Sequence, residues 1–120
     1  MSAQANSARY QLLHIDEIDP TACPCGTSRR AFVDDVDQTA SLHVVETDGT
    51  ARTHYHKRLT ELYYFLEGSG QMELDGKMID IRSGTTVLIK PGCRHRAVGR
   101  LRFIVVPIPA FDPADEWFDD

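Results

Sequence analysis

The sequence predicts an all-β protein that folds as one small sandwich or barrel. From about Ala40 onward, short apolar runs are separated by Gly, Asp-Gly and Pro, which is typical of consecutive antiparallel strands. No segment of comparable length has the periodicity of a helix. With 120 residues, the chain is also too short for two independent cores, because each would bury too little apolar surface. We therefore expect a single domain.

The expected strands are separated by short turns. Asp75-Gly76 is the clearest turn, since glycine tolerates the positive φ of a tight hairpin. Met72 and Leu74 alternate with polar residues before it, as expected for a strand with one buried face. A second turn is expected at Thr47–Gly49. The expected strand segments are 40–46, 61–68, 71–74, 77–84, 85–92, 93–99 and 101–108.

The two ends of the chain are less regular, so we divide it into three parts. Residues 1–30 are interpreted as an N-terminal extension that folds over the barrel or reaches a second copy, and residues 31–109 as the barrel. Residues 110–120 are acidic but retain three aromatic side chains. These aromatics favour docking of the C-terminal segment on the barrel.

Composition and charge narrow the expected partners. The formal net charge of −5 disfavours nonspecific attraction to nucleic acid or to anionic lipid. No signal-peptide core or membrane-spanning run of about 20 apolar residues is present, so a cytoplasmic location is expected. Cys23, Cys25 and Cys93 cannot all pair within one chain, and we expect them to remain thiols.

Three histidines and one glutamate form the pattern that carries chemistry. His54 and His56 are two residues apart, so in an extended strand both imidazoles project to the same face. Glu61 has the opposite parity and faces the same interior only if the chain turns at Lys57–Thr60. His95 follows a Pro-Gly turn much later in the sequence. We predict that these four side chains bind one metal ion.

The residue types restrict which metal would bind. An ionised Glu61 beside the same-parity aromatics Tyr63 and Phe65 is costly unless it coordinates a cation. Three imidazoles and one carboxylate suit Fe(II), Mn(II), Ni(II), Co(II), Cu(II) or Zn(II) better than Ca(II) or Mg(II). An octahedral ion would keep two positions open for water, substrate or dioxygen. For His14 and His43 we favour an ordinary solvated or hydrogen-bonded role.

The combined spacing resembles the cupin superfamily of double-stranded β-helix (jelly-roll) barrels. The matching positions of its two motifs are Gly49, His54, His56, Glu61, Gly68, Gly84, Gly92 and His95. The sequence departs from the motifs with a glycine-to-histidine interval one residue short, Lys90 where proline is expected and Gly99 where asparagine is expected. The resemblance implies a single-domain metal-binding barrel, and since compact cupins commonly form dimers, a homodimer.

Further residues are candidates for roles beside the metal. Arg52 shares the parity of His54 and His56, so in a regular strand it would face the cavity and could hold a carboxylate by paired hydrogen bonds. Tyr63 could donate a proton or bind substrate, with core packing as the alternative. Cys93 shares the parity of His95, although we favour a structural role for this thiol.

Two functions from different classes remain open at this point. The first is a metalloenzyme, dioxygenase-like or isomerase- or lyase-like, that acts on a small anionic molecule. An excess of Lys and Arg around the ligand segments supports an anionic ligand. The second is a non-catalytic metal-containing module that binds or senses a small ligand or sugar. The motifs identify a site and do not identify a reaction.

Overall fold

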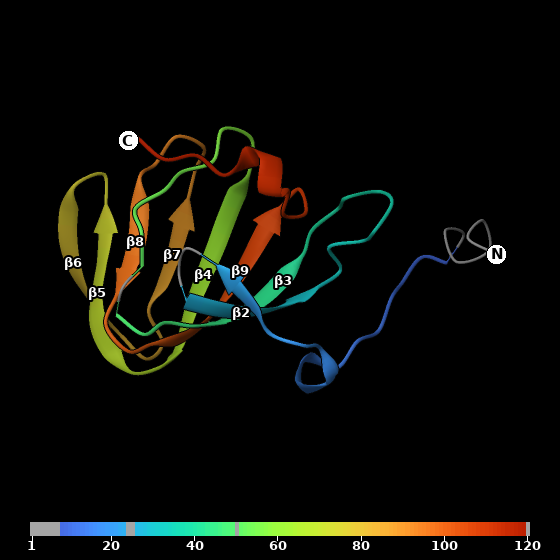
Figure 1. Ribbon diagram of the computed structural model, residues 1–120, viewed down its shortest axis with the longest axis horizontal. Helices are drawn as coiled ribbons and strands as arrows, with labels where there is room; N and C mark the ends of the chain where they lie inside the picture. Colours follow the sequence, from blue (N-terminus) through green and yellow to red (C-terminus); the bar gives the residue numbers. More distant parts are fainter. Residues whose placement is uncertain (1–7, 24–25, 50, 120) are drawn as a thin grey trace.

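The computed structural model describes residues 8–23, 26–49 and 51–119. These residues form two antiparallel sheets, one of six strands in the order β1-β2-β3-β9-β4-β7 and one of three in the order β6-β5-β8 (Figure 1). The all-β double-stranded β-helix prediction is confirmed. The strands are β1 (Thr21–Cys23), β2 (Gly26–Ala31), β3 (Leu42–Glu46), β4 (Thr60–Glu67), β5 (Ser69–Leu74), β6 (Lys77–Arg82), β7 (Thr86–Ile89), β8 (His95–Val98) and β9 (Arg102–Ile108). Two short 3₁₀ helices, η1 (Ile15–Glu17) and η2 (Pro113–Asp115), lie near the ends.

The core lies between the sheets, and along β4 and β9 every second side chain is buried in it. Phe65 of β4, Met72 of β5 and Phe103 of β9 are completely buried. Burying each such side chain stabilises the fold by about 1.5–3 kcal/mol. β4 places Glu61, Tyr63 and Phe65 on its buried face. The apolar core and the candidate metal ligand Glu61 therefore share one face of one strand.

The hairpin predicted at Asp75-Gly76 is confirmed. β5 pairs with β6 in a register that places Leu74 opposite Lys77, so only these two residues connect the strands. Asp75 and Gly76 have φ values of 49° and 85°. Two successive positive φ angles are those of a type I′ turn, whose twist matches that of the flanking strands.

The six-stranded sheet begins earlier in the chain than the sequence pattern indicates. β1 and β2 lie within residues 1–30, and β2 pairs with β3 over residues 27–31 and 42–46. This part of the chain carries no alternation of apolar residues because the side chains that β2 presents to the interior, Ser28 and Arg30, line a polar cavity. The barrel therefore includes strands that lie before residue 31.

The two ends of the chain are placed very differently. Residues 8–14 extend away from the barrel as an arm (Figure 1), and Tyr10, Leu12 and Leu13 on it are 79%, 73% and 49% exposed. The C-terminal segment instead runs across one end of the barrel, where Trp117 forms an isolated antiparallel bridge with Tyr55. Among the described residues, none forms a helix of the length and apolarity required to cross a membrane.

Candidate metal centre

Backbone pairing brings the distant histidines together. The amide of His54 donates to the carbonyl of His95 (3.1 Å), and the amide of His95 donates to the carbonyl of His54 (2.9 Å). The amide of Gly92, in the turn before β8, donates to the carbonyl of His56 (2.7 Å). These bonds hold the segment that carries the histidine pair against the start of β8, although His54 and His95 are 41 positions apart in the sequence.

Glu61 faces the three imidazoles from β4. Its Oε1 lies 3.3 Å from Nε2 of His56 and 3.1 Å from Nε2 of His95. One ligating nitrogen from each of His54, His56 and His95 lies within 4.8 Å of the others. All four residues are buried. The structure therefore brings the three histidines singled out by their spacing together, with Glu61 in contact with two of them.

The other ring nitrogen of each histidine is held by a main-chain carbonyl. Nδ1 of His54 lies 3.0 Å from the carbonyl oxygen of Arg52, Nδ1 of His56 lies 2.7 Å from that of Asp115, and Nδ1 of His95 lies 2.8 Å from that of Cys93. A carbonyl can only accept, so each Nδ1 carries the proton and donates. In the neutral imidazole, Nε2 is then an unprotonated lone pair directed at the centre.

Three atoms at this centre lack any hydrogen-bond partner among the described residues, namely Nε2 of His56, Nε2 of His95 and Oε1 of Glu61. Buried polar atoms are nearly always paired, and leaving one unpaired costs about 1–3 kcal/mol. Lone pairs from three imidazoles and a carboxylate fit a divalent transition metal, with histidine orientation fixed by hydrogen bonds from the second nitrogen. The three histidines could therefore bind a metal ion.

The electrostatics of the four side chains are strongly coupled. Burial opposes ionisation of Glu61, but its contacts with His56 and His95 outweigh that effect and hold its pKa below the usual range. Burial and the neighbouring His95 together lower the pKa of His54 to about 4. The same burial acts on His56, yet the contact with Glu61 raises the pKa of His56 overall.

A cavity of about 40 Å³ adjoins the centre. One wall is formed by His54, His56, Glu61 and Tyr63. The rest of the lining includes Cys23, Ser28, Arg30, His43, Val45, Phe111 and Glu116, which come from β1, β2, β3 and the C-terminal segment. The candidate metal site thus adjoins a small pocket whose lining also includes charged groups.

Comparison with known proteins identifies the family. Residues 41–107 match the family described as the cupin domain. The chain belongs to the cupin family. A curated relative, an uncharacterised protein MJ1618 of Methanocaldococcus jannaschii, is 33% identical over 61 residues, which are 51% of this chain and 49% of that protein. The chain therefore matches about half the length of this relative.

Solved structures agree with the assignment to the cupins. A crystal structure of a protein from Planctomyces limnophilus is 38% identical and superposes with a TM-score of 0.84, covering 92% of this cupin and 98% of that chain. Pac13 of Streptomyces, a nucleoside dehydratase with variants solved with uridine, is 19% identical with a TM-score of 0.77, covering 91% of this chain and 89% of that chain. At this level of identity, the likeness to Pac13 shows a shared fold.

Of the two residues proposed beside the metal, one lines the cupin cavity and the other does not. Tyr63 is 5% exposed, with its ring stacked on Phe103 (5.3 Å) and 5.9 Å from that of His95. Burial raises the pKa of its hydroxyl well above the usual value. Arg52 is exposed, outside the cavity lining, and its guanidinium lies 3.8 Å from the ring centre of Phe118. The segment at Arg52 is not part of a regular strand, so parity does not predict its direction.

The cavity also contains residues that the spacing pattern did not single out as functional. Arg30 was assigned to the N-terminal extension, and Glu116 to the acidic C-terminal segment. His43 was given an ordinary role, and the structure places it 5% exposed, with Nε2 2.8 Å from Oγ of Ser41. These residues come from separate elements, and only the sheet topology places them around one pocket.

Asp115 is the main structural support that the sequence did not reveal. Its carboxylate accepts hydrogen bonds from the backbone amides of Lys57, Arg58 and Leu59 and from the Trp117 indole, at 2.9–3.1 Å. These bonds hold the pKa of Asp115 below its usual value, although burial acts in the opposite direction. The turn expected between His56 and Glu61 is therefore fixed by the C-terminal segment, which also orients His56.

The cysteines differ from the expectation that all of them stay thiols. Cys23 is disulfide-bonded in the structure, which corrects the expectation for that residue. Cys93 is a free, half-buried thiol whose carbonyl, rather than its sulfur, serves the site by orienting His95. Cys25 lies outside the described residues.

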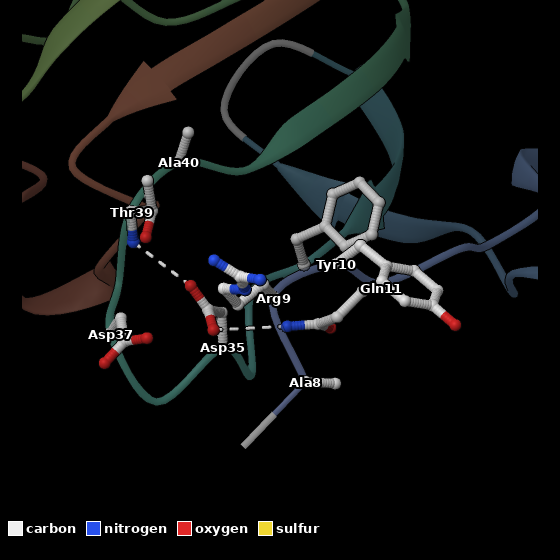
Figure 2. A pocket seen from close by; sticks show the side chains of 9 residues that line it. Ala8, Arg9, Tyr10, Gln11, Asp35, Asp37, Thr39 and Ala40 are labelled. Carbon is white, nitrogen blue, oxygen red and sulfur yellow. Dashed lines mark hydrogen bonds between the residues drawn. The ribbon is translucent and has the colours of Figure 1, made fainter. Parts of the chain in front are cut away.

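A separate hollow in the described part of the chain lies away from the metal centre, and no histidine lines it. It measures about 530 Å³ and lies between the arm and the loop after β2 (Figure 2). Asp35 connects the two, accepting from Nε2 of Gln11 (3.1 Å) and from the amide of Thr39 (3.2 Å). The hydrogen bond between Gln11 and Asp35, which connects the arm to the wall of the hollow, is exposed to solvent. We assign no catalytic role to it.

Proposed function

We propose that this cupin is a metalloenzyme that binds one divalent transition metal through His54, His56, Glu61 and His95 and acts on a small anionic molecule in the adjoining cavity. The observation that carries the proposal is the set of imidazoles whose Nδ1 atoms are bonded to main-chain carbonyls while two of their Nε2 atoms remain buried without a partner. Such preset lone pairs are costly unless a cation is bound.

The protein's own residues would prepare the site for chemistry. A bound metal would supply Lewis acidity and open coordination positions for a substrate oxygen. Asp115 fixes the turn that joins two of the ligands, so the donor atoms are arranged before any ion arrives. Tyr63 presents the one phenolic hydroxyl of the cavity wall, and its high pKa keeps it protonated as a hydrogen-bond donor.

Lyase-like or isomerase-like chemistry is the first choice of reaction class, and oxygen-dependent cleavage is the second. The shared fold with the nucleoside dehydratase Pac13 supports the first choice. A non-catalytic module that binds a small ligand or sugar is the alternative function. The cavity volume of about 40 Å³ accommodates only a few water-sized groups, so under either function it favours a small ligand over a sugar.

The test begins with the metal content of protein as purified, followed by titration of metal-free protein with Fe(II), Mn(II), Ni(II), Co(II), Cu(II) and Zn(II). We expect one ion per chain, lost in His54→Ala and retained in His43→Gln, a matched change of a buried histidine in the same cavity. Products from candidate carboxylates, sought by mass spectrometry with and without air, then separate the reaction classes. Tight metal binding without any product would support the binding module.

We also propose that two copies associate. The exposed Tyr10, Leu12 and Leu13 of the arm leave apolar area uncovered by their own barrel. The outer face of the six-stranded sheet exposes further apolar side chains, at Leu62, Tyr64, Leu88 and Ile108. In a homodimer, the arm of one copy could cover the outer face of the sheet of the other copy, which would bury both sets of apolar side chains.

A further inference from the structure

Arg30 is a cation inside the cavity that the metal ligands do not use. It lies on β2 opposite His43 of β3, and it lines the same pocket as His54, His56 and Glu61. Burial lowers the pKa of Arg30, and the nearby Glu116 counteracts that effect. A guanidinium remains charged in proteins. The pocket beside the metal centre therefore carries a partly desolvated positive charge.

Neighbouring side chains hold this guanidinium in a defined position. Nε of Arg30 donates to Oγ of Ser28 at 2.8 Å, and its central carbon lies 4.8 Å from the ring centre of Phe111. A hydrogen bond on one side and an aromatic face on the other reduce the number of orientations that the side chain can adopt. Only Nε is engaged by the hydrogen bond, which leaves both Nη groups available.

The Nη groups of Arg30 have no carboxylate partner among the described residues. Glu116 lines the same cavity and raises the pKa of Arg30, yet no ion pair between the two is found among the described residues. By contrast, the outward-facing Arg29 donates to the carbonyls of Asp16 and Ile18. A partly buried guanidinium with free donors is suited to paired hydrogen bonds with a planar anion.

We propose that Arg30, positioned by Ser28 and Phe111, binds the carboxylate group of the substrate, and that the substrate is a compact monocarboxylate with a second oxygen directed at the metal centre. This inference rests on the proposed function. Glu61 and Glu116 are acidic groups of the same cavity, so they disfavour a dianion such as a phosphate ester. The cavity volume of about 40 Å³ restricts the molecule to a few heavy atoms.

The inference is tested with pyruvate and its uncharged analogue pyruvamide, titrated calorimetrically into protein loaded with the metal that elemental analysis identifies. Wild-type protein is expected to bind pyruvate at least about tenfold more tightly than pyruvamide, since only the carboxylate forms charge-assisted hydrogen bonds with Arg30. Arg30→Gln is expected to abolish this preference, and Arg30→Lys to keep part of it. Arg29→Gln, on the adjacent residue outside the cavity, serves as the control and should retain it.

A second variant is expected to act in the opposite direction. Glu116→Gln removes a negative charge from the cavity wall and should tighten pyruvate binding several-fold while leaving pyruvamide binding unchanged. Tighter binding of pyruvate alone cannot result from general damage to the fold, because such damage would weaken the binding of both ligands. Methyl phosphate, the dianionic probe, should bind more weakly than pyruvate to both proteins.

The outcomes separate this inference from the proposed function. Failure of wild-type protein to bind any of the six metals would overturn both. Normal metal binding with equal affinity for pyruvate and pyruvamide, or with pyruvate binding undiminished in Arg30→Gln, would overturn the assignment of Arg30 alone. If Arg52→Gln lost the preference for pyruvate and Arg30→Gln kept it, Arg52 would be the residue that binds the carboxylate. That result would also overturn the assignment of Arg30.

Discussion

The metal centre and the N-terminal arm differ in an opposite way from an ordinary protein: the centre buries polar atoms, and the arm exposes apolar side chains. The centre buries lone pairs of His56, Glu61 and His95 without hydrogen bonds, while the arm exposes Tyr10 and Leu12 to water. Buried polar groups are normally satisfied, and contiguous exposed apolar side chains are unusual. Each region would therefore be stabilised by a binding partner, which we propose is a metal ion for the centre and a second copy of the chain for the arm.

The difference lies in how each region is supported. The ligands are fixed by main-chain bonds between His54 and His95 and by the carboxylate of Asp115, whereas the arm is tied down by one exposed bond from Gln11 to Asp35. A prearranged set of donors is suited to a small rigid ligand such as an ion. A loosely held arm can instead adapt to the surface of another polypeptide, which is why we assign it a second copy of the chain.

The largest effect is expected at the centre itself. His95→Ala removes a completely buried ligand and should weaken metal binding by more than about a hundredfold, exceeding the loss typical of residues that only orient ligands. Calorimetric titration of metal-free protein measures it. His43→Gln should keep the metal affinity of the wild type. An equal loss of metal affinity in both variants would contradict the role of His95 as a ligand, because it would show a general effect on the fold.

The second prediction concerns acid and a buried histidine that is not a ligand. Burial and the charge of Arg30 together lower the pKa of His43 from 6.5 to about 4. Between these values the unfolded chain binds the extra proton, so the free energy of unfolding decreases as the pH falls from about 6.5 towards 4. At pH 5 this residue accounts for about 2 kcal/mol of the decrease.

Urea denaturation of metal-free protein at pH 7.5 and pH 5 measures that effect. His43→Gln should lose less stability between the two pH values than the wild type, by about the same amount. His14→Gln, a change of an exposed histidine, should behave as the wild type does. An identical decrease in all three proteins would contradict the role given to His43.

The third prediction separates the support of the centre from its ligands. Asp115→Asn replaces one carboxylate oxygen by an amide and disturbs the bonds that hold the backbone of Lys57, Arg58 and Leu59. We expect metal affinity to fall about 10–100-fold. Asp119→Asn, on an exposed acid paired with Arg94, should have no effect on titration. Unchanged affinity in Asp115→Asn would show that the C-terminal segment does not orient His56.

The smallest expected effect tests the arm. Replacing Leu12 and Leu13 by serine should weaken self-association at least about tenfold, because two apolar side chains would no longer be buried between copies. Sedimentation over a range of concentrations measures it, and metal affinity should stay unchanged. A wild-type protein that sediments as a monomer at high concentration would contradict the proposed dimer.

The sequence predicted the barrel well because short apolar runs separated by turn residues mark the strands from β3 to β9. It did not predict β2, whose inward residues Ser28 and Arg30 are polar and give no such signal. For the site, spacing singled out the residues that the structure brings together. The support from Asp115 depends on a contact across 59 positions of the chain, between its carbonyl and His56, which no local pattern encodes.

The central claim is tested most directly by a crystal grown with the metal that the protein retains, with diffraction recorded at the absorption edge of that metal. The account predicts a single anomalous peak about 2.0–2.3 Å from Nε2 of His54, His56 and His95 and from a carboxylate oxygen of Glu61. A peak at any other position, or the four side chains remaining in place with no ion between them at saturating metal, would contradict it.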